Sequence, residues 1–207
     1  MNNIVLFGGT SGLAKKVIPH LNGTVTALSS KDCDVRNINE IESNLIGNNI
    51  AVYFSVINND NLISNINSAE LDHQIDVNIK GYVNLLKSAG TVWKDTGGSV
   101  IYISSILSST PIKGTGIYSA CKSFGDTLTK VFASEGAKFN IRSNSIQLGY
   151  FDGGLTYEVP DTILENVKKS IPLKRLGDCK ELAHLINSIS ENQYLNGSII
   201  KLTGGLQ

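Results

Sequence analysis

The sequence is poor in cysteine and has no excess charge of either sign, and each shortage excludes a class of protein. Cys33, Cys121 and Cys179 are odd in number and widely spaced, which predicts neither a disulfide framework nor a zinc site. The 18 basic and 18 acidic residues cancel, and no basic block is present. We therefore expect no nucleic-acid partner and no anionic membrane partner. The three histidines are scattered as well, and we expect no bound metal.

The sequence also lacks long apolar runs. None approaches the roughly 18 residues that span a bilayer, and no basic segment precedes the first apolar run as it would in a signal peptide. Reduced thiols fit the same picture. We therefore expect a cytoplasmic protein.

With 207 residues, 41% of them hydrophobic, the chain fits one globular domain over residues 1–207. Segments typical of strands and helices alternate along it, which predicts an α/β fold with a parallel, doubly wound sheet and helices on both faces. We expect strands at 3–7, 24–28, 50–54, 99–105, 141–147 and 198–202 and helices at 14–21, 37–46, 69–89, around Tyr118, 162–170 and 180–190.

A glycine-rich turn follows the first expected strand directly and leads into the first helix. Strand, glycine turn and helix in this order are the context of a dinucleotide-binding fingerprint. The glycines permit a tight turn and let the backbone approach a pyrophosphate closely. The alternative is an ordinary strand-to-helix turn. The expected cofactor contacts here are Gly8, Thr10, Ser11, Gly12 and Leu13.

A second group of residues is able to move a proton to or from a carbonyl or alcohol. Tyr118 and Lys122 are four residues apart, so on a helix they share a face. We expect the Lys122 charge to lower the pKa of Tyr118, which would then serve as general acid or base. Ser105 ends an apolar strand, where its hydroxyl is placed to hold the reacting oxygen. The tyrosine–lysine pair alone is weak evidence, because an amphipathic helix with a solvated lysine gives the same pattern.

From Asn3 to Gly205 the chain resembles the short-chain dehydrogenase/reductase family. The resemblance implies a Rossmann-type sheet of about seven strands. It also implies the roles of the catalytic set, in which Tyr118 exchanges the proton, Ser105 binds the same oxygen, Lys122 also holds the nicotinamide ribose, and Asn78 holds a water between Lys122 and solvent. Asp34 and Val35 resemble the family's adenine contact, and Gly149 its glycine after the sixth strand.

The chain departs from the family pattern at several points. Ala14 replaces the last glycine of the turn, and Phe54-Ser55-Val56-Ile57 stands where the family has Asn-Asn-Ala-Gly. We keep Ser55 of this loop as a predicted cofactor contact. Gly153 replaces a threonine that often binds the carboxamide, with Thr156 as a stand-in. The stretch after residue 28 is short, as if the intervening helix were missing, which predicts an open adenosine end.

The residues after the second expected strand bear on the choice of cofactor. NAD enzymes place a carboxylate about 20 residues after the turn, but this chain has Ser29, Ser30 and Lys31. Two hydroxyls and a cation suit a 2′-phosphate, so NADP(H) is favoured over NAD(H). A solvated loop, with Asp32 turning toward the ribose, is the alternative.

The resemblance implies an oxidoreductase that transfers hydride between a nicotinamide and a small-molecule carbonyl or alcohol substrate. One alternative is a sugar-nucleotide epimerase or dehydratase, but such enzymes usually have a substantial C-terminal domain and little chain follows Gly149 here. Another is a non-enzymatic cofactor-sensing regulator, a class that often loses the tyrosine. The family also implies assembly as a homodimer or homotetramer through the helices carrying Asn78 and Tyr118.

Overall fold

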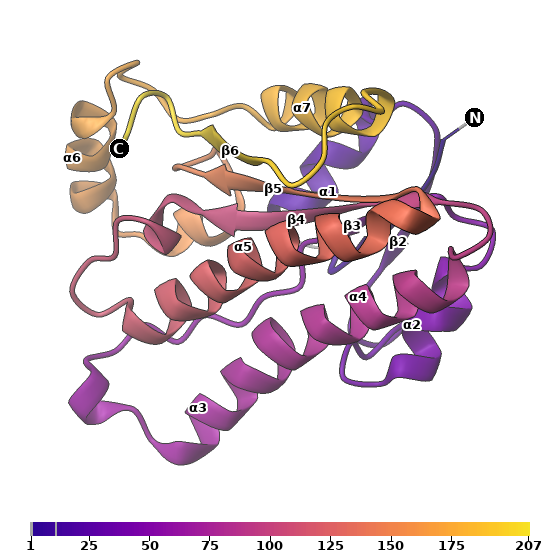
Figure 1. Cartoon of the computed structure of the whole chain (residues 1–207). Helices are drawn as coiled ribbons and strands as arrows, with labels where there is room; N and C mark the ends of the chain where they lie inside the picture. Colours follow the sequence, from indigo (N-terminus) through magenta and orange to yellow (C-terminus); the bar gives the residue numbers. More distant parts are fainter. Residues whose placement is uncertain (1, 11) are drawn as a thin grey trace.

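The computed structural model describes residues 2–10 and 12–207, in which one six-stranded parallel sheet lies between two layers of helices (Figure 1). The strand order is β2-β1-β3-β4-β5-β6, so the predicted doubly wound α/β fold is confirmed. The strands are β1 (Asn3–Phe7), β2 (Thr24–Leu28), β3 (Ile50–Tyr53), β4 (Gly98–Ser105), β5 (Ile141–Leu148) and β6 (Ile199–Leu202).

The helices pack on both faces because the central strands are apolar on both sides. Along β1, Val5 and Phe7 face one core, which α2, α4 and α5 cover, while Ile4 and Leu6 face the other, which α1 and α7 cover. This alternation follows from the two-residue period of a strand. The α-helices are α1 (Gly12–Val17), α2 (Ile38–Leu45), α3 (Ser68–Ile75), α4 (Gly81–Val92), α5 (Gly116–Gly136), α6 (Asp161–Ser170) and α7 (Cys179–Glu191).

The sheet has six strands in the described residues, one fewer than the family resemblance implied. The segment 29–37 after β2 is too short for a helix and a further strand, and it leads directly into α2. Since α2 crosses over β1 to reach β3, β2 becomes the edge of the sheet. The short segment agrees with the expected missing helix, and the open adenosine end stays a prediction.

The long helix predicted at 69–89 is interrupted by one π-helical turn, η3 (Asp76–Lys80), between α3 and α4. The chain continues through it without a break in Figure 1. Such turns are rare and occur mostly at functional sites. This one carries Asn78, so the catalytic asparagine implied by the resemblance stands on a distorted turn.

Among the described residues, no helix combines the length and the hydropathy that crossing a membrane requires.

Candidate functional site

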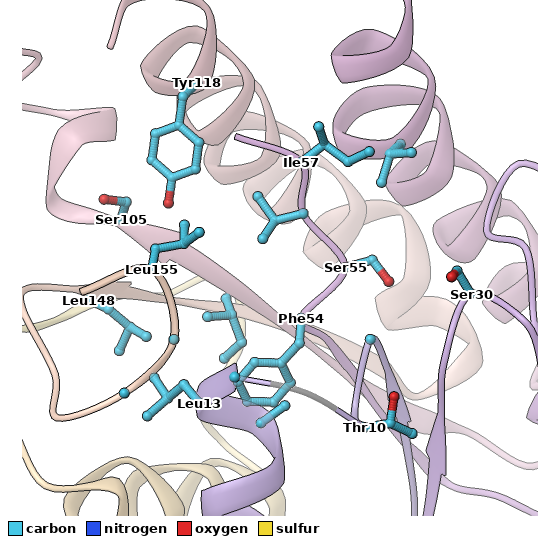
Figure 2. Close-up of a pocket in the computed structure, with 18 of the residues that line it drawn as sticks. Thr10, Leu13, Ser30, Phe54, Ser55, Ile57, Ser105, Tyr118, Leu148 and Leu155 are labelled. Atoms are coloured by element: carbon cyan, nitrogen blue, oxygen red, sulfur yellow. The ribbon is translucent and has the colours of Figure 1, made fainter. Parts of the chain in front are cut away.

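A cavity of about 1060 Å³ opens at the carboxyl ends of β1 to β5, which is where ligands bind in sheets of this kind. Figure 2 shows side chains from the glycine turn, the loop after β3, the end of β4 and α5 around one space. Most predicted site residues meet here. Those lining the cavity are Gly8, Thr10, Gly12, Leu13, Ser29, Ser30, Asp34, Val35, Ser55, Ser105, Tyr118, Lys122 and Gly149.

The glycine turn at one end of the cavity is fixed by close backbone packing. Gly8 has a φ of 79°, and a Cβ there would lie 2.8 Å from the backbone nitrogen of Ser55. The backbone nitrogens of Gly8 and Gly9 both donate to the Leu28 carbonyl, at 3.0 and 2.9 Å. A side chain at position 8 would therefore push the turn away from the loop after β3. The predicted contact Ser11 lies outside the described residues.

Tyr118 and Ser105 meet at the other end of the cavity. Figure 2 shows the Tyr118 hydroxyl pointing down from α5 toward the level of Ser105, which is the last residue of β4. Burial raises the pKa of Tyr118 to about 12, although a hydrogen bond with Ser105 opposes the shift. The Ser105 hydroxyl also accepts the Leu107 backbone N–H at 3.2 Å. Two hydroxyls thus lie close together at this end of the cavity.

Lys122 stands behind Tyr118 and is buried. Its ammonium donates to the Ile103 carbonyl at 2.7 Å and lies 5.6 Å from the centre of the Tyr118 ring. Burial lowers its own pKa to about 8. The expectation that Lys122 lowers the pKa of Tyr118 is wrong for this structure, because the ammonium faces the ring and a carbonyl, and burial of the phenol dominates.

Asn78 is not one of the described residues that line the cavity. It lies behind the loop after β3. It is 2% exposed, and its amide oxygen accepts the Ile57 N–H at 2.8 Å while its amide nitrogen donates to the Ile57 carbonyl at 2.7 Å. Both ends of its side-chain amide are therefore bonded to the Ile57 backbone, and the role of holding a water for Lys122 stays a prediction. Asn78 fixes the loop whose residues Val56 and Ile57 line the cavity.

The segment after β2 forms a turn closed by its own hydrogen bonds. Ser29 and Ser30 line the cavity, but Lys31 is absent from its described lining. The Asp32 carboxylate accepts the Ser29 N–H at 2.9 Å and the Ser29 hydroxyl at 2.6 Å, and these bonds lower the pKa of Asp32. Asp32 therefore closes the turn, and neither Asp32 nor Lys31 is among the described residues that line the cavity.

Arg36 supplies the cation at this end of the cavity, which the sequence analysis missed. It lines the cavity and pairs with Asp34, with Nη2 2.6 Å from the carboxylate. The guanidinium holds the pKa of Asp34 below its usual value. His73 of α3 lines the same end. Proximity to Asp34 in sequence was a signal for Arg36, whereas nothing in the sequence indicated His73.

A short loop after β5 covers the glycine turn. Gly154 has a φ of 60°, and a Cβ on Gly12 would lie 3.3 Å from the Gly154 Cα. Lys16 of α1 ties this loop down by donating to the Tyr157 hydroxyl at 2.6 Å and to the Asp152 carbonyl at 2.8 Å. The partners are far apart in the sequence, so no local pattern predicted the contact. We call residues 152–158 the covering loop.

Comparison with known proteins gives consistent results. Residues 29–207 match the family model described as Enoyl-(Acyl carrier protein) reductase. A 3-oxoacyl-[acyl-carrier-protein] reductase from Bos taurus is 32% identical over 199 residues, covering 94% of this chain and 83% of the relative. An acetoacetyl-CoA reductase from Synechocystis sp. is 26% identical over 227 residues, covering 97% and 94%. A solved small-chain dehydrogenase in complex with NADPH has a TM-score of 0.88 at 21% identity, covering 99% of this chain and 97% of that one, which shows the fold.

The parallel sheet with a glycine turn and a Tyr118–Lys122 pair at its carboxyl edge defines a Rossmann-type oxidoreductase. The chain belongs to the short-chain dehydrogenase/reductase family. Its relatives above are reductases, which favours the predicted oxidoreductase over an epimerase, a dehydratase or a regulator.

Proposed function

We propose that this protein is an NADPH-dependent reductase that acts on the ketone of a 3-oxoacyl thioester. The observation that carries the proposal is that one cavity joins the glycine turn to the hydroxyls of Tyr118 and Ser105. The names of the Bos taurus and Synechocystis relatives support a 3-oxoacyl substrate for those proteins. Apolar side chains line the same cavity, among them Ile57, Leu148 and Leu155, and suit an acyl chain (Figure 2).

The chain's own residues divide the chemistry among them. NADPH, when bound, supplies the hydride. Tyr118 donates a proton to the ketone oxygen, and Ser105 donates a hydrogen bond to the same oxygen and so stabilises its developing charge. Lys122 binds the nicotinamide ribose hydroxyls.

The residues at the adenosine end fit NADPH better than NADH. Ser29 and Ser30 carry no charge, and Arg36 brings a guanidinium into the cavity. Arginine matches the geometry of a phosphate group. Arg36 therefore takes the role that the sequence analysis gave to Lys31. Asp32 does not compete, because Ser29 occupies its carboxylate.

The same proposal covers the organisation of the protein. Residues 1–207 act as one cytoplasmic domain that assembles into a homodimer or homotetramer, with neither nucleic acid nor membrane as a partner. Support for assembly comes from α5, which leaves Phe124 and Val131 exposed at 36% and 47%. Size-exclusion chromatography with light scattering tests the assembly, and a monomer at micromolar concentration would contradict it.

The activity is tested by following NADPH oxidation with acetoacetyl-CoA, an enoyl-CoA, a keto-sugar and simple ketones. We expect turnover of acetoacetyl-CoA and a loss of about 10²–10⁴-fold in Tyr118→Phe, with NADPH affinity nearly unchanged because the ring still packs. Retention of more than about a tenth of the rate would refute the role of Tyr118. Turnover of only the enoyl-CoA would refute the substrate assignment.

A further inference from the structure

Asp126 of α5 is a buried carboxylate to which the reaction described above gives no role. It is 7% exposed. It accepts hydrogen bonds from the Ser145 hydroxyl at 2.6 Å, the Ser108 hydroxyl at 2.7 Å and the Gln147 amide at 2.8 Å. All three donors are neutral, and Asp126 takes part in none of the ion pairs found in the described part of the chain. A buried charge without a paired counter-charge is unfavourable, so its presence calls for a function.

Lys122 lies one helical turn before Asp126 on the same face of α5. Lys122 is 4% exposed, and its ammonium donates to a neutral carbonyl, that of Ile103. Two side chains of opposite charge are therefore buried one helical turn apart, and they form no ion pair in the described part of the chain. Asp126 opposes the lowering of the Lys122 pKa that burial causes, and the thiol of Cys121 acts in the same direction. The ring of Tyr102 on β4 faces the ammonium from below, at 5.0 Å.

The hydrogen-bond donors of the Asp126 carboxylate connect it to the end of the cavity where Ser105 and Tyr118 lie. Ser108 belongs to the turn η4 (Ile106–Ser108), which begins directly after Ser105. Gln147 donates to the Ser108 hydroxyl at 2.7 Å as well as to Asp126. The carboxylate therefore holds α5, β5 and the turn after Ser105 in one arrangement.

We propose that Asp126 is a positioning residue that serves as the buried counter-charge of Lys122 and keeps it cationic at neutral pH. The consequence for catalysis rests on the proposed function, in which cationic Lys122 holds the nicotinamide ribose. The electrostatic coupling between the two side chains exists without cofactor and is measurable without it.

The first test uses the cofactor-free protein and the variant Asp126→Asn. The free energy of unfolding in urea is measured from pH 6 to pH 9 for the wild type and for Asp126→Asn, each with Lys122 intact and with Lys122→Met. In each case the difference between the protein with Lys122 intact and its Lys122→Met variant gives the contribution of Lys122 to stability. Because the pKa of Lys122 is lower folded than unfolded, its contribution to stability rises with pH above its folded pKa. In Asp126→Asn the onset of this rise, the pH at which the contribution of Lys122 begins to increase, should lie about one pH unit lower. An unchanged onset would overturn the proposal.

Ser145→Ala is the matched control, because it removes one hydrogen bond to the same carboxylate and keeps the charge. Its onset should equal that of the wild type. An onset that moves equally in Ser145→Ala and Asp126→Asn would show that packing, not charge, is responsible, and would overturn the counter-charge role.

A measurement on the unmodified protein covers the case in which Asp126→Asn does not fold. The carboxyl ¹³C shift of Asp126 should show a step when Lys122 loses its proton near pH 8, and Lys122→Met should lack this step. A flat titration in both proteins would overturn the proposal. NADPH affinity should decrease as the pH rises and Lys122 loses its charge. In Asp126→Asn this decrease should begin at a lower pH than in the wild type. If NADPH binds at no pH while the cofactor-free shift is present, the proposed function fails and the counter-charge stands.

Discussion

The hydroxyl of Tyr53 donates a 2.7 Å hydrogen bond to the carbonyl of Val77, inside the π-helical turn that carries Asn78. Tyr53 is the last residue of β3 and is fully buried. Gly81 makes room for it, since a Cβ there would lie 2.3 Å from the Tyr53 hydroxyl oxygen. The strand end and the distorted helix are thereby locked together, and through Asn78 so is the loop that lines the cavity.

Tyr53→Phe should therefore impair function as well as stability. Losing this hydrogen bond costs about 1–2 kcal/mol of unfolding free energy, and the loosened turn should raise the KM for cofactor. Tyr82→Phe is the control, because Tyr82 is equally buried and its hydroxyl bonds to Thr129 at 2.8 Å, away from the turn. Urea unfolding and steady-state kinetics measure both effects. Equal KM values in the two variants would show that Tyr53 does not position the turn.

The raised pKa of Tyr118 gives a prediction for alkaline pH. Its folded pKa of about 12 exceeds the ordinary value of 10.0, so the unfolded chain loses this proton first. The resulting stability is present below pH 10 and is lost as the pH rises toward 12. Relative to Tyr118→Phe, the free energy of unfolding of the wild type should decrease by at most about 2–3 kcal/mol between pH 10 and pH 12. Unfolding curves at pH 9 and pH 11 measure the difference, and a wild type that gains on the variant would reverse the assigned direction.

Much of the fold was predictable because the strands and helices carry strong local patterns. Each expected strand is present, and the glycine turn, Ser105, Tyr118 and Lys122 reach one cavity. The family resemblance implied about seven strands, one more than the described residues form.

The parts of the site that sequence reasoning missed depend on contacts between distant segments. Lys16 meets Tyr157, and Asp126 meets Gln147, only after the sheet is assembled. The turn after β2 is closed by hydrogen bonds between Ser29 and Asp32, which the residue types alone did not specify. The pKa of Tyr118 depends on the balance of burial and charge, which residue spacing does not determine.

Arg36 should set the preference for NADPH. Arg36→Gln should weaken binding of 2′,5′-ADP by about tenfold, the effect of one charge-assisted contact on a half-exposed side chain, while 5′-AMP binding changes little. Lys31→Gln is the matched control, since Lys31 is absent from the described cavity lining. Calorimetry measures the dissociation constants of 2′,5′-ADP and 5′-AMP, and their ratio reports the preference for the 2′-phosphate. If Lys31→Gln shifts the ratio and Arg36→Gln does not, the original assignment to Lys31 is the correct one.

The covering loop should control how fast the cofactor leaves. The Tyr157 hydroxyl accepts a hydrogen bond from Lys16 at 2.6 Å and donates one to the Asp152 carboxylate at 2.9 Å, and Lys16 also lies over its ring at 4.8 Å. Tyr157→Phe removes both hydrogen bonds and keeps the ring. Because the loop lies against Gly12, we expect the cofactor to pass it on leaving the glycine turn.

In Tyr157→Phe we expect NADPH to dissociate several-fold faster in stopped-flow displacement, with little change in unfolding free energy because the contact is exposed. Tyr194→Phe is the control, since Tyr194 is fully exposed and does not line the cavity. If product release limits turnover, kcat should rise together with the dissociation rate. An unchanged dissociation rate in Tyr157→Phe would show that the loop opens freely without breaking the contact between Lys16 and Tyr157.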